Sequence, residues 1–84
     1  MKSKMIVALA LIVLSACVSE FEIASSEVPE IVMNAFKNKY PGATDTEWEV
    51  EKKEGKLYFE AEFKMDGKKK EAYFRPDGTF GMEE

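Results

Sequence analysis

The sequence contains no histidine and a single cysteine, Cys17, among its 84 residues. These absences exclude an intrachain disulfide, a zinc site of thiolates and imidazoles, and a catalytic nucleophile paired with histidine. Basic residues are also in the minority, with 12 Lys and Arg against 16 Asp and Glu. Because nucleic-acid-binding proteins are usually basic, we expect no nucleic-acid partner. The chain length fits one small domain.

The chain changes in composition at Cys17. Lys2 and Lys4 precede an uncharged run that ends at Cys17, and no acidic residue occurs before Glu20. A basic start followed by about a dozen apolar residues is typical of a secretory signal, and such a run is shorter than the roughly 20 residues that span a bilayer. Loss of residues 1–16 would remove two of the 12 basic residues and none of the 16 acidic ones, which changes the net charge from -4 to -6.

The sequence LSAC at residues 14–17 resembles the lipobox of bacterial lipoproteins. In that family a Leu and two small residues precede a cysteine that is acylated and becomes the new N-terminus. The resemblance implies a signal peptide over 1–16, membrane attachment through acylated Cys17, and secretion across the inner membrane. Val18 is not the Asp linked with inner-membrane retention in some lipoproteins, which favours the outer membrane, facing the periplasm. The alternative is a buried N-terminal helix with a core cysteine.

Residues 17–27 are expected to form a tether between the lipid and the domain. Serines and glutamates dominate this stretch without a clear period. Phe21 and Ile23 alternate with glutamates, which leaves a short extra strand as the alternative.

A domain over residues 28–84 is expected to begin with an amphipathic helix. Pro29 suits the first helical turn, and Pro41-Gly42 ends the helix, because the residue before a proline avoids the helical region. Apolar residues follow the helical period and form one stripe: Val28, Ile31, Val32, Ala35, Phe36 and Tyr40.

Three turn signals divide the rest of the domain into four strands. Glu54-Gly55 and Asp66-Gly67 are two-residue hairpin signals, and Pro76-Asp77-Gly78 is a three-residue turn. The predicted fold class is therefore α+β, with one N-terminal helix packed on one face of a four-stranded antiparallel meander sheet. An exposed sheet edge would also allow a homodimer.

The register that these turns impose gathers the apolar residues on one face of the sheet. It places Phe74 opposite Phe80 and Ala72 opposite Met82 across the last turn. The predicted apolar face contains Trp48, Val50, Leu57, Phe59, Ala61, Phe63, Met65, Ala72, Phe74, Phe80 and Met82.

The same register makes the opposite face acidic. Glu49 is predicted opposite Glu60, and Glu62 between Glu47 and Glu71. Like charges directly opposite each other are destabilising, so this face suits a cationic partner or Ca²⁺, which prefers oxygen ligands. The alternative is a solvated face with its charges spread into water. The candidate metal ligands are Glu47, Glu49, Glu60, Glu62 and Glu71.

Two tyrosines on this acidic face are candidate partner-binding residues. Tyr58 is predicted opposite Arg75, and Tyr73 opposite Gly81 and beside Glu60. Exposed tyrosines can anchor a protein partner, although a tyrosine opposite a glycine can simply cover it. We expect no catalytic residues and no cofactor, because a single sheet under one helix offers no cleft that would separate the pKa values of paired carboxylates.

The order of several motifs resembles the PepSY-like, or β-lactamase-inhibitor-like, domain of secreted and periplasmic bacterial proteins. Members often carry two repeats, whereas this chain shows one, and the family implies no catalytic residues. The resemblance favours a non-enzymatic interaction module, inhibitory or regulatory towards an envelope protein. The alternative is a structural or Ca²⁺-binding small lipoprotein. The motifs, over about residues 28–82, are VP at 28–29, AF at 35–36, YPGA at 40–43, WE at 48–49, YFEAEF at 58–63, DG at 66–67 and FRPDG at 74–78.

Overall fold

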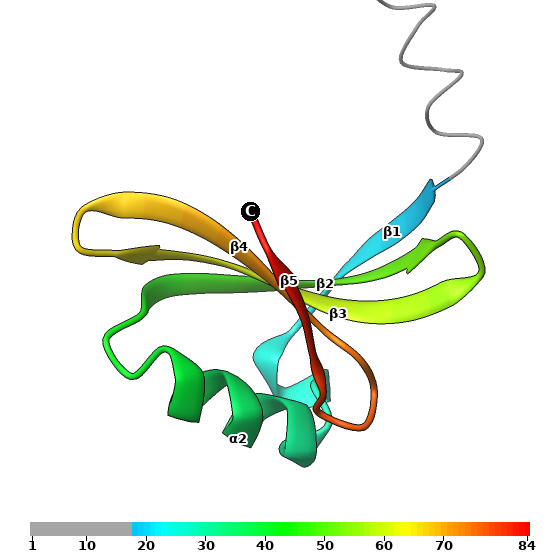
Figure 1. Ribbon diagram of the computed structural model, residues 1–84, viewed down its shortest axis with the longest axis horizontal. Coiled ribbons are helices and arrows are strands. Elements are labelled where there is room, and N and C mark those ends of the chain that lie inside the picture. Colours follow the sequence, from blue (N-terminus) through cyan, green and yellow to red (C-terminus); the bar gives the residue numbers. More distant parts are fainter. Residues whose placement is uncertain (1–17) are drawn as a thin grey trace, which may run out of the picture.

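The computed structural model describes residues 18–84, so the predicted signal peptide and Cys17 lie outside the described residues. The described chain forms one antiparallel sheet with a helix against one of its faces (Figure 1). Its elements are β1 (Val18–Ile23), the 3-10 helix η1 (Ser25–Glu27), α2 (Glu30–Lys39), β2 (Thr44–Lys53), β3 (Lys56–Met65), β4 (Lys68–Phe74) and β5 (Phe80–Glu83).

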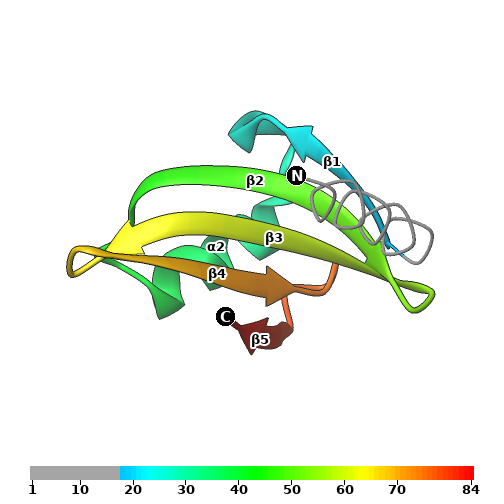
Figure 2. The same cartoon turned by 90° about the horizontal axis from the view of Figure 1, so that it is seen from above.

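The predicted fold class is wrong, because the sheet has five strands and its first strand precedes the helix. The strand order is β1-β2-β3-β4-β5, and the molecule is mostly β (Figure 2). Residues 18–27, which we expected within a tether, instead form β1 and η1. Phe21 pairs with Val50 and Ile23 with Trp48, so β1 extends the apolar face of β2. Its pairing partner follows only after α2, which is why the local sequence pattern indicates this strand weakly.

The helix α2 packs on the sheet through one side, as predicted. Val32 and Phe36 are buried, and Pro29 caps the first turn with its carbonyl accepting from the backbone N–H of Val32 at 3.0 Å. Ile31, which we placed in the buried stripe, is 55% exposed. It lies at the margin of the helix beside the turn at Gly78. Within residues 18–84, no helix is long and apolar enough to cross a membrane.

The two predicted two-residue hairpins are confirmed. Glu54 and Gly55 have φ of 52° and 79°, and Asp66 and Gly67 have φ of 55° and 75°. Positive φ at both central residues is the signature of a type I′ turn, whose twist matches that of the flanking strands. The resulting register is the predicted one, with Val50 opposite Phe59, Trp48 opposite Ala61, Phe59 opposite Phe74 and Ala61 opposite Ala72.

The register of β5 departs from the prediction by one residue. Phe74 pairs with Phe80 as expected, but Ala72 pairs with Glu83 and Tyr73 with Met82. The extra residue is Gly81, where a Cβ would lie 3.2 Å from Tyr58 Cε1 and 3.2 Å from the Tyr73 carbonyl oxygen. An inserted residue of this kind is a β-bulge, and it reverses the faces of the residues that follow.

The bulge brings Glu83 to the helix side of the sheet. There the Tyr40 hydroxyl donates a hydrogen bond of 2.7 Å to Glu83 Oε1, and Lys70 Nζ donates one of 3.0 Å to Glu83 Oε2. The first contact connects the end of α2 to β5, and the second connects β4 to β5.

The core forms around Phe36 of α2. Its ring makes edge-to-face contacts with Trp48 at 5.1 Å, Phe63 at 5.2 Å and Phe74 at 6.2 Å between centroids. Each of these side chains comes from a different strand, so one helical residue joins β2, β3 and β4. Such aromatic pairs each add about 0.5–1.5 kcal/mol beyond the burial of their area.

Candidate functional site on the acidic face

The sheet face opposite α2, which we call the acidic face, carries glutamates from four neighbouring strands. The predicted pairs are confirmed, with Glu49 opposite Glu60 and Glu62 opposite both Glu47 and Glu71. Strand β1 adds two further pairs, Glu20 with Glu51 and Glu22 with Glu49. The ion pairs of the described residues lie elsewhere, between Lys64 and Asp45 and between Lys70 and Glu83.

Glu60 lies at the centre of this face, on the middle strand of the five. It is 3% exposed, with Glu49 beside it on β2 and Tyr73 beside it on β4. One carboxylate oxygen from each of Glu49, Glu60 and Glu62 lies within 4.8 Å of the others. The structure thus brings together three of the five candidate metal ligands, while Glu47 and Glu71 lie outside this group of three.

The environment of Glu60 strongly favours its neutral form. Burial, followed by the charges of Glu71 and Glu49, raises the pKa of Glu60 to about 9. Burial and the charge of Glu20 also raise the pKa values of Glu49 and Glu51. Glu60 therefore holds a proton at neutral pH, and a positive charge placed over this face would be attracted by the carboxylates around it.

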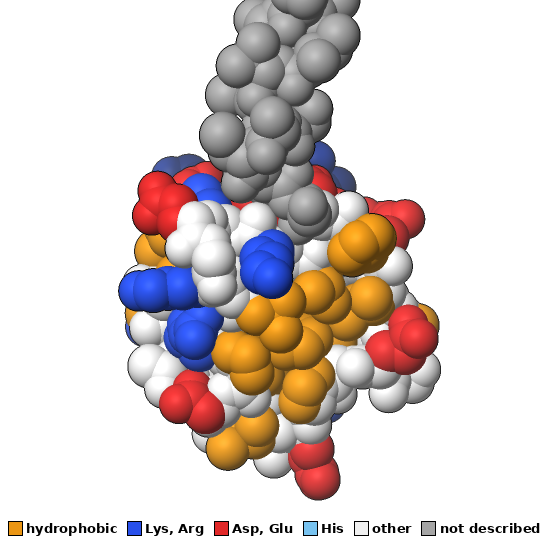
Figure 3. Space-filling view, turned by 90° about the vertical axis from the view of Figure 1, so that its right-hand side faces the viewer, with side chains coloured by type: hydrophobic (Ala, Val, Ile, Leu, Met, Phe, Trp, Pro, Cys, Tyr) orange, Lys and Arg blue, Asp and Glu red, His pale blue; other side chains and the backbone are white. Residues whose placement is uncertain are grey.

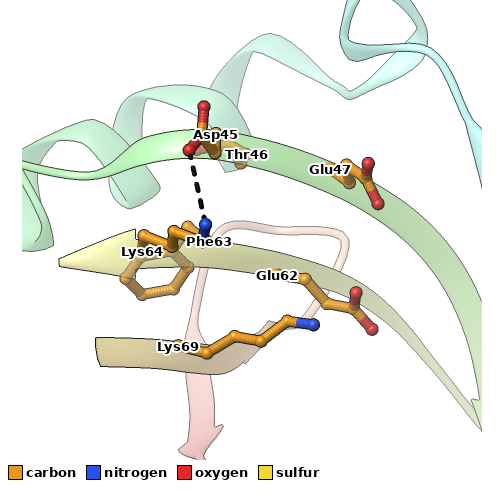
Figure 4. Close-up of a pocket in the computed structure, with 7 residues that line it drawn as sticks. All are labelled: Asp45, Thr46, Glu47, Glu62, Phe63, Lys64 and Lys69. Carbon is orange, nitrogen blue, oxygen red and sulfur yellow. Dashed lines mark ion pairs between the residues drawn. The ribbon is translucent and has the colours of Figure 1, made fainter. Parts of the chain in front are cut away.

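An open hollow of about 410 Å³ borders the acidic face where β2 is irregular (Figure 4). Asp45 has a φ of 52° there, and its Oδ2 lies 3.9 Å from Lys64 Nζ. Figure 4 shows Glu47 and Glu62 projecting to the same side, with Lys69 extended toward Glu62. The hollow therefore offers side chains of both signs at the surface.

The candidate residues Tyr58, Tyr73 and Arg75 contact one another, with Tyr58 between the other two. Tyr73 is 4% exposed, so it is not accessible as a surface anchor, and burial followed by the charge of Glu60 raises the pKa of its hydroxyl. The Tyr58 ring meets Tyr73 edge-on at 6.1 Å, and the Arg75 guanidinium carbon lies 5.3 Å from the Tyr58 centroid. Tyr58, rather than the predicted Tyr73, covers Gly81.

The structure also has an exposed apolar surface that the sequence analysis did not predict. Phe21 and Leu57, on the helix side of the sheet, are 66% and 37% exposed. Figure 3 views this end of the molecule and shows apolar side chains gathered in one patch with basic side chains beside it. The lengths of the elements could have revealed it, because a helix of 10 residues spans about 15 Å and strands of 10 residues span about 33 Å. One helix cannot cover the whole face.

No family model, curated protein or solved structure matches this chain. The resemblance to the PepSY-like domain and to bacterial lipoproteins therefore stays a prediction from the motifs in the sequence.

Proposed function

We propose that this protein is a non-enzymatic, lipid-anchored interaction module of the bacterial envelope that binds a partner protein through its acidic face. The observation that carries the proposal is the grouping on one sheet face of glutamates that form no ion pair within residues 18–84. A partner with a complementary Lys- and Arg-rich surface would relieve the repulsion among these carboxylates and would be attracted to them before contact. Binding of this protein would regulate or inhibit the partner.

The anchor in this proposal is acylated Cys17. Cys17 directly precedes Val18, the first residue of β1, so the sheet would be held close to the membrane surface. One acyl chain gives only reversible attachment, whereas two or more hold a protein stably. Such an anchor would confine the module to partners in the same membrane or in the adjacent periplasm.

Cross-linking of the full-length protein in cells, followed by its recovery from envelope extracts, tests this function. We expect one defined partner, and we expect the double variant Glu49→Gln/Glu62→Gln to lose it because two carboxylates of the central group become neutral. Glu27→Gln/Glu30→Gln is the matched control, since it makes the same charge change beside α2. Recovery of this chain alone, as in a homodimer through a sheet edge, would contradict the proposal, and so would equal recovery with both variants.

Calcium binding is the second candidate function, and a specific observation favours it. Glu60 is a buried carboxyl directed into the group of three oxygens formed with Glu49 and Glu62. A bound Ca²⁺ would displace the Glu60 proton, so a calcium titration should raise the melting temperature and release protons into a weak buffer. An unchanged melting temperature over the whole titration would eliminate this candidate.

A further inference from the structure

We propose that the end of the molecule formed by residues 52–57, the turn end, lies against the membrane, with Phe21 and Leu57 in the lipid interface and Lys52 and Lys56 at anionic headgroups. The inference deepens the proposed function and rests on its lipid anchor at Cys17. It adds an orientation of the domain, in which the turn end of the sheet faces the lipid.

The position of β1 places the anchor beside the turn end. Val18 pairs with Lys53 and Ser19 with Lys52, so the first residues after Cys17 run alongside the β2–β3 turn. An extended strand rises about 3.3 Å per residue, which places Phe21 about 10 Å along β1 from Val18. A flexible tether would have allowed any orientation, but β1 replaces the tether and joins the anchor point directly to the sheet.

The exposed apolar side chains lie at the same end. Phe21 pairs with Val50 on β2, and Leu57 pairs with Lys52 two residues further along that strand. Phe21 and Leu57 therefore flank β2 on the helix side of the sheet, beyond the reach of α2, and both are exposed. Phenylalanine and leucine beside lysines are the combination that peripheral proteins insert into the headgroup and acyl boundary.

The turn end differs in charge from the acidic face. Residues 52–57 carry Lys52, Lys53 and Lys56 against the single acidic residue Glu54, whereas the chain from Cys17 onward has a net charge of -6. Anionic headgroups attract juxtamembrane lysines and would repel the acidic face. The turn end can therefore approach such a membrane, and the acidic face stays free for a partner.

A second basic end, Lys68-Lys69-Lys70, provides the internal comparison. It begins at the opposite end of β3, whose 10 residues span about 33 Å. It has a similar charge, but it is distant from the anchor. If charge alone set the orientation, the two ends would compete, whereas the position of β1 favours the turn end.

Depth-dependent fluorescence quenching tests the orientation. The full-length lipidated protein, with a fluorophore at Leu57→Cys, is reconstituted into phosphatidylcholine–phosphatidylglycerol vesicles that contain brominated lipids. Acylation blocks Cys17, so the introduced thiol is the one that reacts. We expect quenching about twofold or more greater than at Lys68→Cys, because an interfacial residue enters about 5–10 Å into the boundary region. Circular dichroism verifies that both variants retain the fold.

Three outcomes distinguish a failure of the proposed orientation from a failure of the lipid anchor. Protein that does not float with the vesicles contradicts the lipid anchor, and the orientation falls with it. Protein that floats but shows equal quenching at the two positions refutes the orientation and leaves the anchor intact. A probe at position 57 that is shielded from both water and lipid also refutes it, since a second copy or a protein would then cover the patch.

Charge reversal at the turn end tests the contribution of its lysines. Lys52→Glu/Lys56→Glu should lower the quenching at position 57 in phosphatidylglycerol vesicles while flotation persists, with Lys68→Glu/Lys69→Glu as the matched control. Equal effects of the two double variants would refute the role assigned to the turn end.

Discussion

Replacement of Glu60 by glutamine should stabilise the fold at neutral pH. Glutamine has nearly the same shape as glutamic acid and cannot ionise. The pKa of Glu60 is raised from the ordinary 4.5 to about 9, so between these values the folded protein keeps a proton that the unfolded chain releases. The free energy of unfolding contributed by this group is therefore greatest below about pH 4.5 and is lost as the pH rises through 9.

The size of the effect follows from the width of that interval. Each pH unit between the two pKa values costs about 1.4 kcal/mol, so at about pH 7 the folded state is penalised by about 3 kcal/mol. Glu60→Gln removes this penalty. For a domain of this size the gain corresponds to a rise in melting temperature on the order of 10–20 °C. At about pH 4, where Glu60 is protonated in both states, the variant and the wild type should have equal stability.

Thermal unfolding of both proteins between about pH 4 and pH 9 measures the difference. The quantity to compare is the difference in stability between the two proteins at each pH. Hydrogen bonds to Thr79 and to Tyr40 lower the pKa values of Asp77 and Glu83, so protonation of these two groups destabilises both proteins in acid. Glu22→Gln, an exposed residue of β1, controls for the change in net charge. A variant that is less stable than wild type at neutral pH, or a difference that does not grow with pH, would show that Glu60 does not hold its proton in the folded protein.

Three further substitutions test the fold. Glu54 has a φ of 52°, and Glu54→Asn should raise the free energy of unfolding by about 0.5–1 kcal/mol in denaturant titrations; a decrease would count against the type I′ turn. Phe36→Ala removes the centre of the aromatic core and should lower the free energy of unfolding by about 3–5 kcal/mol in denaturant titrations followed by circular dichroism. Tyr40→Phe loses the 2.7 Å hydrogen bond to Glu83 and should cost about 1 kcal/mol, whereas a neutral effect would show that this link to β5 contributes nothing.

The hairpins could be predicted because their information is local. The pairs at 54–55 and 66–67 require positive φ, and the two-residue loops that they form fix which strand residues face each other. The stripe from Val28 to Tyr40 likewise specified a helix within one segment of sequence. In these elements the residues that decide the structure are neighbours in the chain.

The strand β1 and the bulge in β5 escaped prediction because both depend on distant contacts. Only Phe21 and Ile23 indicate a strand in β1, and their partners on β2 follow after the whole of α2. At the bulge, Gly81 has no room for a side chain because Tyr58, on another strand, occupies the space where a Cβ would lie. Neither contact leaves a periodic pattern in its own segment.

The acidic face could be predicted in its composition but not in its electrostatics. The register alone placed Glu49 opposite Glu60. Glu60 is buried between Glu49 on β2 and Tyr73 on β4, and this burial depends on contacts across strands that no local sequence pattern reveals.

Metabolic labelling of the full-length protein with an alkyne fatty acid, followed by cell fractionation, measures whether Cys17 carries a lipid that holds the protein in the membrane. The wild type should be labelled and recovered in the membrane fraction, and Cys17→Ser should be unlabelled and released from it. Phe21→Ser/Leu57→Ser, which changes the membrane-facing patch and keeps the cysteine, should remain labelled and membrane-bound. A wild type without label, or a Cys17→Ser variant that stays in the membrane fraction, would contradict the account.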